Sequence, residues 1–321
     1  MTSEHAIRLH DQQPSDSDVE SEVLEGLTSD PKRLSPKFFY DQRGSELFEQ
    51  ITELPEYYPT RTEIAIMEQR VDEIAERVGP KASLIEFGSG SSTKTRILLR
   101  HLTDLAAYVP VDISGDHLLD TARSLAEDYP DLEILPVAAD FTQPFDLPSP
   151  RTMPERNVVF FPGSTIGNFA PDKAVELLNV MAAEAKPGGA AIVGVDLKKD
   201  PAILEAAYND SQGVTAEFNL NVLRRINEEL DADFDLSAFA HRAIYNEGAG
   251  RIEMNLVSRR HQTVNISGEI IDFRKGESIL TECSYKFTCK EFAAMVAQAG
   301  FEVETVWTDK DRLFSVQFLT R

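Results

Sequence analysis

The sequence contains little cysteine and no long hydrophobic run, and both absences restrict what the protein can be. Its two cysteines, Cys283 and Cys289, lack the even, repeated spacing of a disulfide-stabilised secreted scaffold, and no second Cys/His pair completes a zinc site. We therefore expect two reduced cysteines and no metal. No apolar run reaches the length needed to cross a bilayer, and the polar, acidic N-terminus lacks a signal-peptide pattern. The sequence favours a cytoplasmic protein that binds no membrane.

Basic residues are scarce relative to acidic ones. The 321 residues include 32 lysines and arginines against 54 aspartates and glutamates, which gives a formal net charge of −22. Nucleic acids and anionic membranes are bound by clustered Lys and Arg, so this balance argues against both as partners. At 42% hydrophobic and 27% charged residues, the composition is that of a globular enzyme long enough for two lobes.

From residue 82 onward the hydrophobic pattern alternates between strand and helix. Short apolar runs predict buried strands, and amphipathic segments between them predict helices. This alternation is typical of a doubly wound α/β sheet. The predicted strands are 82–87, 107–112, 133–138, 157–162 and 190–196, and the predicted helices are 93–103, 115–128 and 171–186.

After residue 196 the alternation gives way to predicted helix over 201–229, a loop or short helix over 231–240, and then segments with the period-two pattern of antiparallel strands. We interpret this change as a second lobe. A closing antiparallel strand pair near the C-terminus is assigned back to the first sheet. The expected division is a first domain of 60–195 plus 287–321, a second lobe of 20–59 plus 196–286, and a flexible N-terminus of 1–19 that is poor in apolar residues.

A glycine turn after the first predicted strand indicates a ligand site. The strand stops at Gly88-x-Gly90, and the helix that follows has Lys94 in its first turn. Glycines at this place let a ligand approach the backbone. The dinucleotide fingerprint has a third glycine three residues later, where this chain has Thr93, so a cofactor without a pyrophosphate suits the turn better.

Acidic residues end the next two predicted strands. Asp112 ends the second, where a carboxylate can accept hydrogen bonds from ribose hydroxyls. Asp140 and Phe141 follow the third, where the carboxylate can accept from the exocyclic amine of adenine and the ring can pack against the base. Both acids lie at one edge of one predicted sheet. Together with the glycine turn they favour S-adenosylmethionine, although each acid alone could be a cap or turn residue.

Four further runs carry a resemblance to one family. They are Lys37–Asp41, Leu54–Glu63, Gly163–Asn168 and Thr281–Ser284. Through them the chain resembles the L-histidine Nα-methyltransferases of ergothioneine biosynthesis, over nearly its whole length. The resemblance implies an α/β fold, a Rossmann-like S-adenosylmethionine methyltransferase domain with a second α+β substrate-binding lobe. It also implies trimethylation of the α-amine of L-histidine, through mono- and dimethyl intermediates, to the betaine hercynine.

The resemblance further implies which residues form the site. Two tyrosines, Tyr40 and Tyr57, would lie near the reacting amine as the catalytic residues. The implied cofactor-binding residues are Gly88, Lys94, Asp112, Asp140 and Phe141. The implied substrate-binding residues are Tyr57, Gly163, Asn168, Tyr208, Met254, Glu282 and Ser284.

The residue types suit histidine as a substrate. Glu282 and Ser284 are two apart in a predicted strand, so their side chains share a face. A carboxylate can accept from one imidazole N–H, and a hydroxyl can bond the other ring nitrogen. The Asn168 amide and the Tyr208 hydroxyl can both donate to a carboxylate. The structural alternatives are a solvated outer face for the strand pair, a helix cap for Asn168, and core packing for Tyr208 and Met254.

Three other functions stay open from the residues. The first is a methyltransferase acting on another free amino acid such as tryptophan, for which the Glu282 carboxylate would have less use. The second is a nicotinamide-dependent oxidoreductase, which the missing third glycine disfavours. The third is a non-enzymatic regulator that binds adenosine without turnover. We expect a monomer, and we expect the six scattered histidines to lie at the surface.

Overall fold

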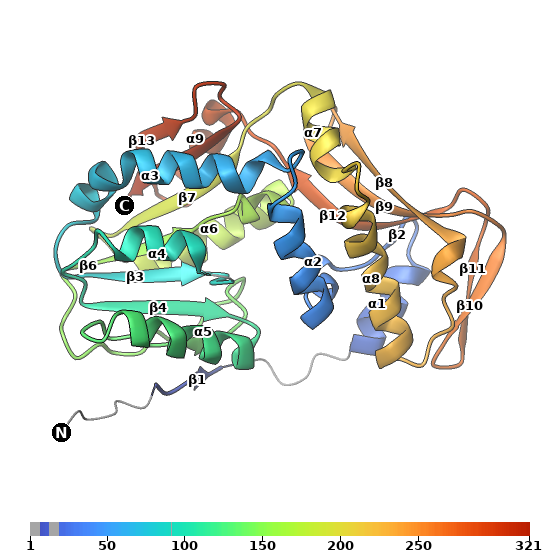
Figure 1. Cartoon of the computed structure of the whole chain (residues 1–321), viewed down its shortest axis with the longest axis horizontal. Coiled ribbons are helices and arrows are strands. Elements are labelled where there is room, and N and C mark those ends of the chain that lie inside the picture. Colours follow the sequence, from blue (N-terminus) through green and yellow to red (C-terminus); the bar gives the residue numbers. More distant parts are fainter. Residues whose placement is uncertain (1–6, 13–18, 91) are drawn as a thin grey trace. The chain divides into compact units, whose positions relative to one another are not determined.

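A computed structural model describes residues 7–12, 19–90 and 92–321, and the chain forms two compact units (Figure 1). Among the described residues, the first unit contains 7–12, 62–197 and 287–321, and the second contains 19–61 and 198–286. Of the N-terminus that we expected to be flexible, residues 1–6 and 13–18 lie outside the described residues. His10–Asp11 form a short strand, β1, that pairs with β5.

An eight-stranded sheet forms the centre of the first unit, with the strand order β1-β5-β4-β3-β6-β7-β14-β13. Strands β3 to β7 are parallel, β14 runs antiparallel to β7, and β13 antiparallel to β14. The predicted Rossmann-like α/β fold with a closing antiparallel pair is confirmed. The remaining strands of this sheet are β3 Ala82–Phe87, β4 Ala107–Asp112, β5 Val137–Ala138, β6 Arg156–Phe161, β7 Ala190–Asp196, β13 Glu302–Thr308 and β14 Phe314–Thr320.

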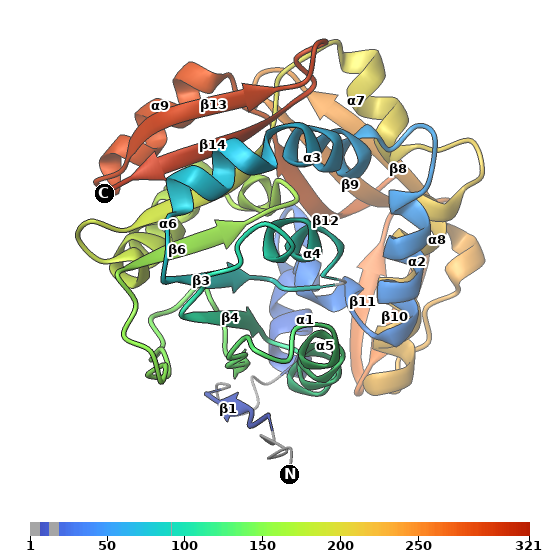
Figure 2. The ribbon, with the colours of Figure 1, turned by 60° about the vertical axis from the view of Figure 1, so that its left-hand side comes forward.

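Helices cover both faces of this sheet. Figures 1 and 2 show α3, α4 and α5 on one face and α6 and α9 on the other. Every position of β3 and β7 is buried, as parallel strands between two helix layers require. Burying each large apolar side chain stabilises the fold by roughly 1.5–3 kcal/mol. The helices are α3 Tyr58–Val78, which enters this unit at Thr62, α4 Thr93–Leu99, α5 Gly115–Asp128, α6 Pro171–Ala185 and α9 Cys289–Gln298.

The third strand of the predicted sheet is shorter than expected. We predicted a strand over 133–138, but β5 contains only Val137–Ala138, and Ile134 makes an isolated bridge to Tyr108. Pro136 lies between the two pieces and has no N–H to donate to the ladder. The proline therefore interrupts a strand that its apolar pattern alone would continue.

The second unit is built on a four-stranded sheet of order β2-β12-β9-β8, with β10 and β11 as a separate antiparallel pair. Strand β8 was not predicted, because its polar residues hide the period-two pattern and it is held by pairing with β9. The strands are β2 Lys32–Arg33, β8 Phe239–Asn246, β9 Arg251–Ser258, β10 Gln262–Ile266, β11 Glu269–Phe273 and β12 Ser278–Tyr285.

The single helix predicted over 201–229 is two helices, α7 Pro201–Tyr208 and α8 Val214–Glu229. Asp210 separates them. Its carboxylate accepts from the backbone N–H groups of Val214 at 2.9 Å and Thr215 at 2.8 Å, so it caps the start of α8. The other helices of this unit are α1 Val19–Thr28 and α2 Gln42–Thr52, and α2 packs on α8.

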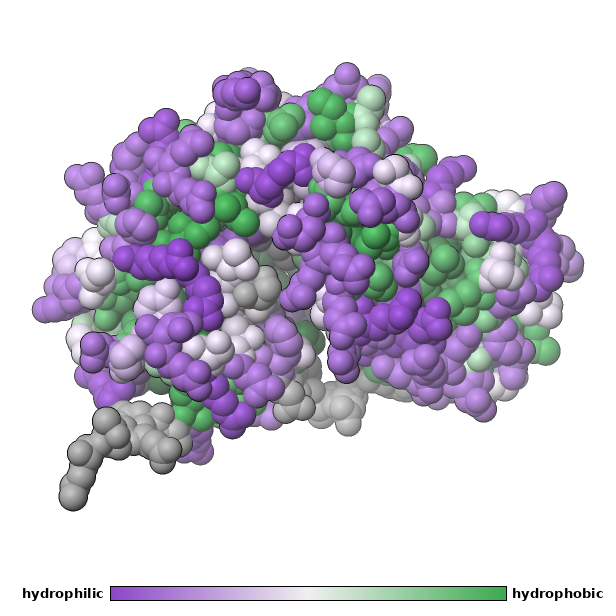
Figure 3. Space-filling view, viewed as in Figure 1, coloured by the Kyte–Doolittle hydropathy of each residue, from purple (hydrophilic) through white to green (hydrophobic). Residues whose placement is uncertain are grey.

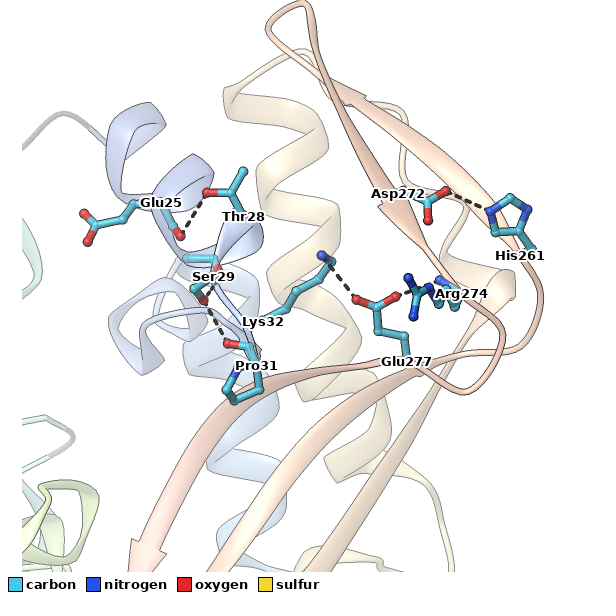
Figure 4. Close-up of polar contacts among 10 residues, drawn as sticks. Glu25, Thr28, Ser29, Pro31, Lys32, His261, Asp272, Arg274 and Glu277 are labelled. Carbon is cyan, nitrogen blue, oxygen red and sulfur yellow. Dashed lines mark hydrogen bonds and ion pairs between the residues drawn. The ribbon is translucent and has the colours of Figure 1, made fainter.

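An ion pair lies where β12 begins beside β2. Lys32 Nζ lies 3.2 Å from Glu277 Oε1, and the Arg274 N–H donates to Glu277 Oε2 at 2.7 Å (Figure 4). In the β10–β11 hairpin nearby, His261 Nε2 lies 2.8 Å from Asp272 Oδ1. The Lys32–Glu277 pair joins β2 to the residue before β12, whose far end carries the polar residues of the site.

Hydrophilic side chains cover most of the face shown in Figure 3, with smaller hydrophobic areas between them. This coverage agrees with the acidic composition of the chain. Over residues 7–12, 19–90 and 92–321, no helix is both long and apolar enough to cross a membrane.

Candidate active site

The strand order of the first unit reverses beside β3. The chain builds outward from β3 through β4 to β5, then returns to place β6 and β7 on the other side of β3. In open α/β sheets, ligands bind outside the carboxyl ends of the strands at such a reversal. The loops that leave β3 and β6 at this edge contain Gly88 (φ 71°) and Gly163 (φ 80°). The fold therefore places two glycine-containing loops at the expected ligand edge.

The turn after β3 requires glycine for its backbone angles. Gly88 and Gly90 have φ values of 71° and 36°, in the left-handed region that residues with side chains rarely adopt. The Gly88 N–H donates to Val111 O at 2.8 Å, which holds the turn against β4. A Cβ on Gly88 would lie 3.7 Å from Phe141, an ordinary contact. Backbone conformation, not lack of room, thus demands glycine here.

A buried carboxylate lies directly beneath this turn. Glu86 is 2% exposed, and its Oε2 accepts hydrogen bonds from Thr95 Oγ1 at 2.6 Å and from the Tyr108 hydroxyl at 2.5 Å. Burial raises the pKa of Glu86 to about 7, while the two hydrogen bonds and the Lys94 charge act in the opposite direction. Glu86 therefore ties β3, β4 and α4 together. Sequence reasoning missed it, although an acid inside an apolar run was a visible signal.

The ammonium of Lys94 is paired with a second buried acid. Lys94 Nζ lies 2.5 Å from Glu63 Oε2. The Gly163 N–H also donates to both Glu63 oxygens, at 3.0 and 2.9 Å. A Cβ on Gly194 would lie 2.0 Å from Glu63 Oε1, so only glycine leaves room for this carboxylate. The pair links the helix after β3 with the loop after β6.

The two acids predicted at the strand ends are oriented by their own loops. Asp112 Oδ1 accepts from the Ser114 N–H at 3.0 Å, and burial raises the pKa of Asp112. Asp140 Oδ1 accepts from the N–H and the hydroxyl of Thr142 at 2.9 and 2.7 Å. Each acid is a turn residue, as the structural alternative proposed. Asp112 also accepts from the backbone N–H groups of Gly90 and Ile113. Both bonds of Asp140 use one oxygen, so its turn role leaves the second oxygen for a ligand.

Phe141 joins an aromatic cluster at the same edge. Its ring stacks on Phe87 with centroids 5.5 Å apart and meets Phe161 edge to face at 5.8 Å. These contacts fix the ring beside the ends of β3 and β6. Phe141 remains partly exposed, so ring surface is left for a base.

Gly163 and Asn168 belong to this unit as well. Asn168 ends a short 3-10 helix, Thr165–Asn168, in the loop after β6. The next helix, α6, has Ala170 as its N-cap residue and no side-chain cap. The alternative that Asn168 caps that helix is therefore wrong, and the residue lies in the loop at the carboxyl end of β6.

In the second unit, β12 presents a polar face that is largely buried. Ser284 is 4% exposed, and its Oγ accepts from the Tyr208 hydroxyl and from Lys286 Nζ, both at 2.9 Å. Lys286 Nζ also donates to the Tyr208 hydroxyl at 3.0 Å. Ser284 thus does not lie on a solvated outer face. Sequence reasoning missed Lys286, because its partner Tyr208 is 78 residues away in sequence.

Glu282 lies on the same face of β12, next to Lys286. Desolvation raises the pKa of the Glu282 carboxyl to about 7, and the charge of Lys286 opposes this shift. Within the described part of the chain, no group donates a hydrogen bond to this carboxylate, which is partly exposed. Met254 pairs with Glu282 across the β9–β12 ladder and is 2% exposed. An acceptor with available oxygens is therefore held beside a buried thioether.

Four aromatic rings form a continuous series of edge-to-face contacts in this unit. Tyr40 meets Phe48 at 5.9 Å, Phe48 meets Tyr57 at 6.4 Å, and Tyr57 meets Tyr208 at 6.3 Å. The two predicted catalytic tyrosines are thus connected through Phe48, which sequence reasoning missed. Asp41, beside Tyr40, caps α2 by accepting from the Gly44 N–H at 2.5 Å.

The prediction that the histidines lie at the surface is wrong for His241. This residue is partly buried, with Nδ1 2.9 Å from Asn219 Nδ2 and Nε2 2.8 Å from Tyr208 O. Desolvation lowers its pKa, which favours a neutral ring that donates from Nε2 and accepts at Nδ1. Because α8 covers β8, the histidine is enclosed and its polar atoms are satisfied. It thereby fixes the backbone at Tyr208.

The reversal point, the glycine turn and the acids at the ends of β4 and β5 define a Rossmann-like, S-adenosylmethionine-dependent methyltransferase. A methyltransferase of that type from Clostridium acetobutylicum has the same fold, with a TM-score of 0.50 and 9% identity over 86% of this chain and 98% of that chain. Residues 19–321 match the family of histidine-specific, S-adenosylmethionine-dependent methyltransferases, and the chain belongs to this family.

Two relatives extend this finding. The chain is 43% identical to the histidine N-alpha-methyltransferase of Mycolicibacterium smegmatis, over 94% of each chain. It is 30% identical to ergothioneine biosynthesis protein 1 of Neurospora crassa, over 96% of this chain and 37% of that longer protein.

Proposed function

We propose that this protein transfers methyl groups from S-adenosylmethionine to the α-amine of L-histidine, three in turn, to form hercynine in ergothioneine biosynthesis. The observation that carries the proposal is the family match, which spans residues 19–321 and so includes both units. The histidine and ergothioneine roles of the two relatives support it.

The first unit is assigned to the cofactor, as the expected domain of 60–195 plus 287–321. Its residues fit S-adenosylmethionine, because the positive-φ turn exposes backbone to a ligand. Carboxylates at the strand ends are the acceptors that ribose hydroxyls and the adenine amine require. When bound, the cofactor supplies an electrophilic methyl on a sulfonium. The residues that would hold it are Gly88, Lys94, Asp112, Asp140 and Phe141.

The second unit is assigned to histidine, as the expected lobe of 20–59 plus 196–286. Glu282 would accept from one imidazole N–H, and Ser284 would bond the other ring nitrogen, with Met254 beside the ring. Carboxylate acceptors and hydroxyl donors match the two kinds of imidazole nitrogen. In the first unit, Gly163 and Asn168 are also assigned to the substrate, with the Asn168 amide as a donor to a carboxylate.

The chemistry requires a neutral amine, since an ammonium has no lone pair to attack the methyl group. An α-amino group has a pKa of about 8, so a useful fraction is neutral near neutral pH and no strong base is needed. Positioning by Tyr40 and Tyr57 would supply much of the acceleration. Their ring faces would also accommodate the cationic product through cation–π attraction.

The test is mass spectrometry of L-histidine incubated with the protein and S-adenosylmethionine, with L-tryptophan in a parallel reaction. The proposal expects gains of one, two and three methyl units on histidine and none without the protein. Absence of methylated histidine would reject the proposal. Faster methylation of tryptophan would replace it with the alternative substrate.

We also propose that the protein acts in the cytoplasm as a monomer, without nucleic acid or a membrane surface. The net charge of −22 supports the absence of nucleic acid and membrane partners, because their anionic surfaces would be repelled. Light scattering in solution tests the monomer, and a mass near twice that of the chain would reject it.

A further inference from the structure

A lysine ammonium is enclosed in the second unit, beside the proposed imidazole site. Lys286 is 2% exposed, and its Nζ contacts Tyr208 and Ser284 at 3.0 and 2.9 Å. The ammonium also lies 4.9 Å from the centroid of the Tyr208 ring. A charged group is costly to bury and is almost never found fully enclosed without polar partners. Its position therefore calls for a role beyond packing.

The hydrogen bonds in this triad of Tyr208, Ser284 and Lys286 converge on the serine oxygen. An ammonium only donates, so both hydroxyl oxygens accept from Lys286. The Tyr208 hydroxyl donates its single proton to Ser284 Oγ at 2.9 Å. Both acceptor positions of Ser284 Oγ are then filled, and Ser284 can only donate its own proton to a further group.

We infer that Lys286 is a positioning residue that makes Ser284 a hydrogen-bond donor toward the ring nitrogen of histidine that carries no proton. This inference rests on the proposed function and deepens it. Glu282 and Ser284 share one face of β12, so the strand presents one acceptor and one donor. That pair matches a neutral imidazole in a single tautomer and mismatches a ring that offers only N–H groups.

A mutant cycle tests whether Lys286 acts through the serine hydroxyl. Lys286→Met should raise the KM for histidine about tenfold, the effect of losing one oriented hydrogen bond, with the KM for S-adenosylmethionine unchanged. In the Ser284→Ala background, the same substitution should change the histidine KM less than about threefold, because no hydroxyl remains to orient. Lys275→Met, at an exposed lysine of the same unit, is the matched control and should leave both constants unchanged.

A second measurement does not depend on the folding of the lysine variants. A histidine analogue with pyrrole in place of imidazole keeps the N–H and lacks the acceptor nitrogen. The unsubstituted protein should show about a tenfold higher KM for this analogue, and Ser284→Ala should remove the difference.

The outcomes separate the two proposals. Equal effects of Lys286→Met in both serine backgrounds, or equal KM values for histidine and its pyrrole analogue in the unsubstituted protein, would overturn the role of Lys286 while methylation of histidine persists. Failure of the unsubstituted protein to methylate histidine at all would instead overturn the proposed function.

Discussion

Replacing Glu86 with glutamine should make the first unit progressively more stable than the unsubstituted protein as the pH rises. The folded-state pKa of Glu86 is about 7 against an ordinary value of 4.5. Between these values the folded protein binds the proton and the unfolded chain does not, so rising pH costs stability. One pKa unit corresponds to about 1.4 kcal/mol, which makes the loss across the window about 3 kcal/mol.

The glutamine variant removes this titration and preserves the local contacts. Thr95 and Tyr108 both donate to one oxygen, Oε2, so an amide oxygen can accept both bonds. The free energy of unfolding of Glu86→Gln should therefore increase, relative to that of the unsubstituted protein, by about 3 kcal/mol between pH 4.5 and pH 8.

Urea denaturation followed by tryptophan fluorescence measures this difference. The chain has a single tryptophan, Trp307, which is 5% exposed in β13 and reports on the first unit. Glu76→Gln, at an exposed position on α3, is the matched control and should follow the pH dependence of the unsubstituted protein. A stability difference for Glu86→Gln that does not vary with pH would refute the reasoning.

Three further predictions concern the substrate, the reaction and the packing of the site. Glu282→Ala should weaken histidine binding by about 1–3 kcal/mol, through an unpaired ring N–H, and leave cofactor binding unchanged in calorimetry; equal losses would make Glu282 structural. The single-turnover methylation rate should rise with pH through the amine pKa of about 8, and a pH-independent rate would count against a neutral attacking amine. Gly194→Ala should destabilise the first unit by about 1–3 kcal/mol, because its Cβ would lie 2.0 Å from Glu63 Oε1. Gly248→Ala, where the nearest contact would be 3.5 Å, is its control, and equal melting temperatures for the two variants would contradict this argument.

The central strands of the first unit were predictable because parallel strands between two helix layers are apolar throughout. Strands β3, β4, β6 and β7 match their predicted ranges to within a residue. The prediction was wrong where a local feature competed with the apolar pattern. Pro136 cut β5 short, and Asp210 divided the helix predicted over 201–229.

The candidate site was predictable only where its chemistry follows the local pattern. Asp112 and Asp140 stand at strand ends, and Ser284 alternates with Glu282 along one strand, so spacing alone selected them. The roles of Glu63 and Lys286 could not be predicted from local spacing. Glu63, for example, contacts Gly163, which is 100 residues away in sequence.

The sequence by itself determined the alternation of strand and helix, the glycine turn and the polar residues at the strand ends. These features depend on side-chain periodicity and backbone preference, which act over a few neighbouring residues. Tertiary structure alone decided that Lys286 is enclosed and that His241 lies beneath α8. It also brought the Tyr208 hydroxyl to Ser284. Burial and hydrogen-bond direction depend on groups that only the folded chain brings together.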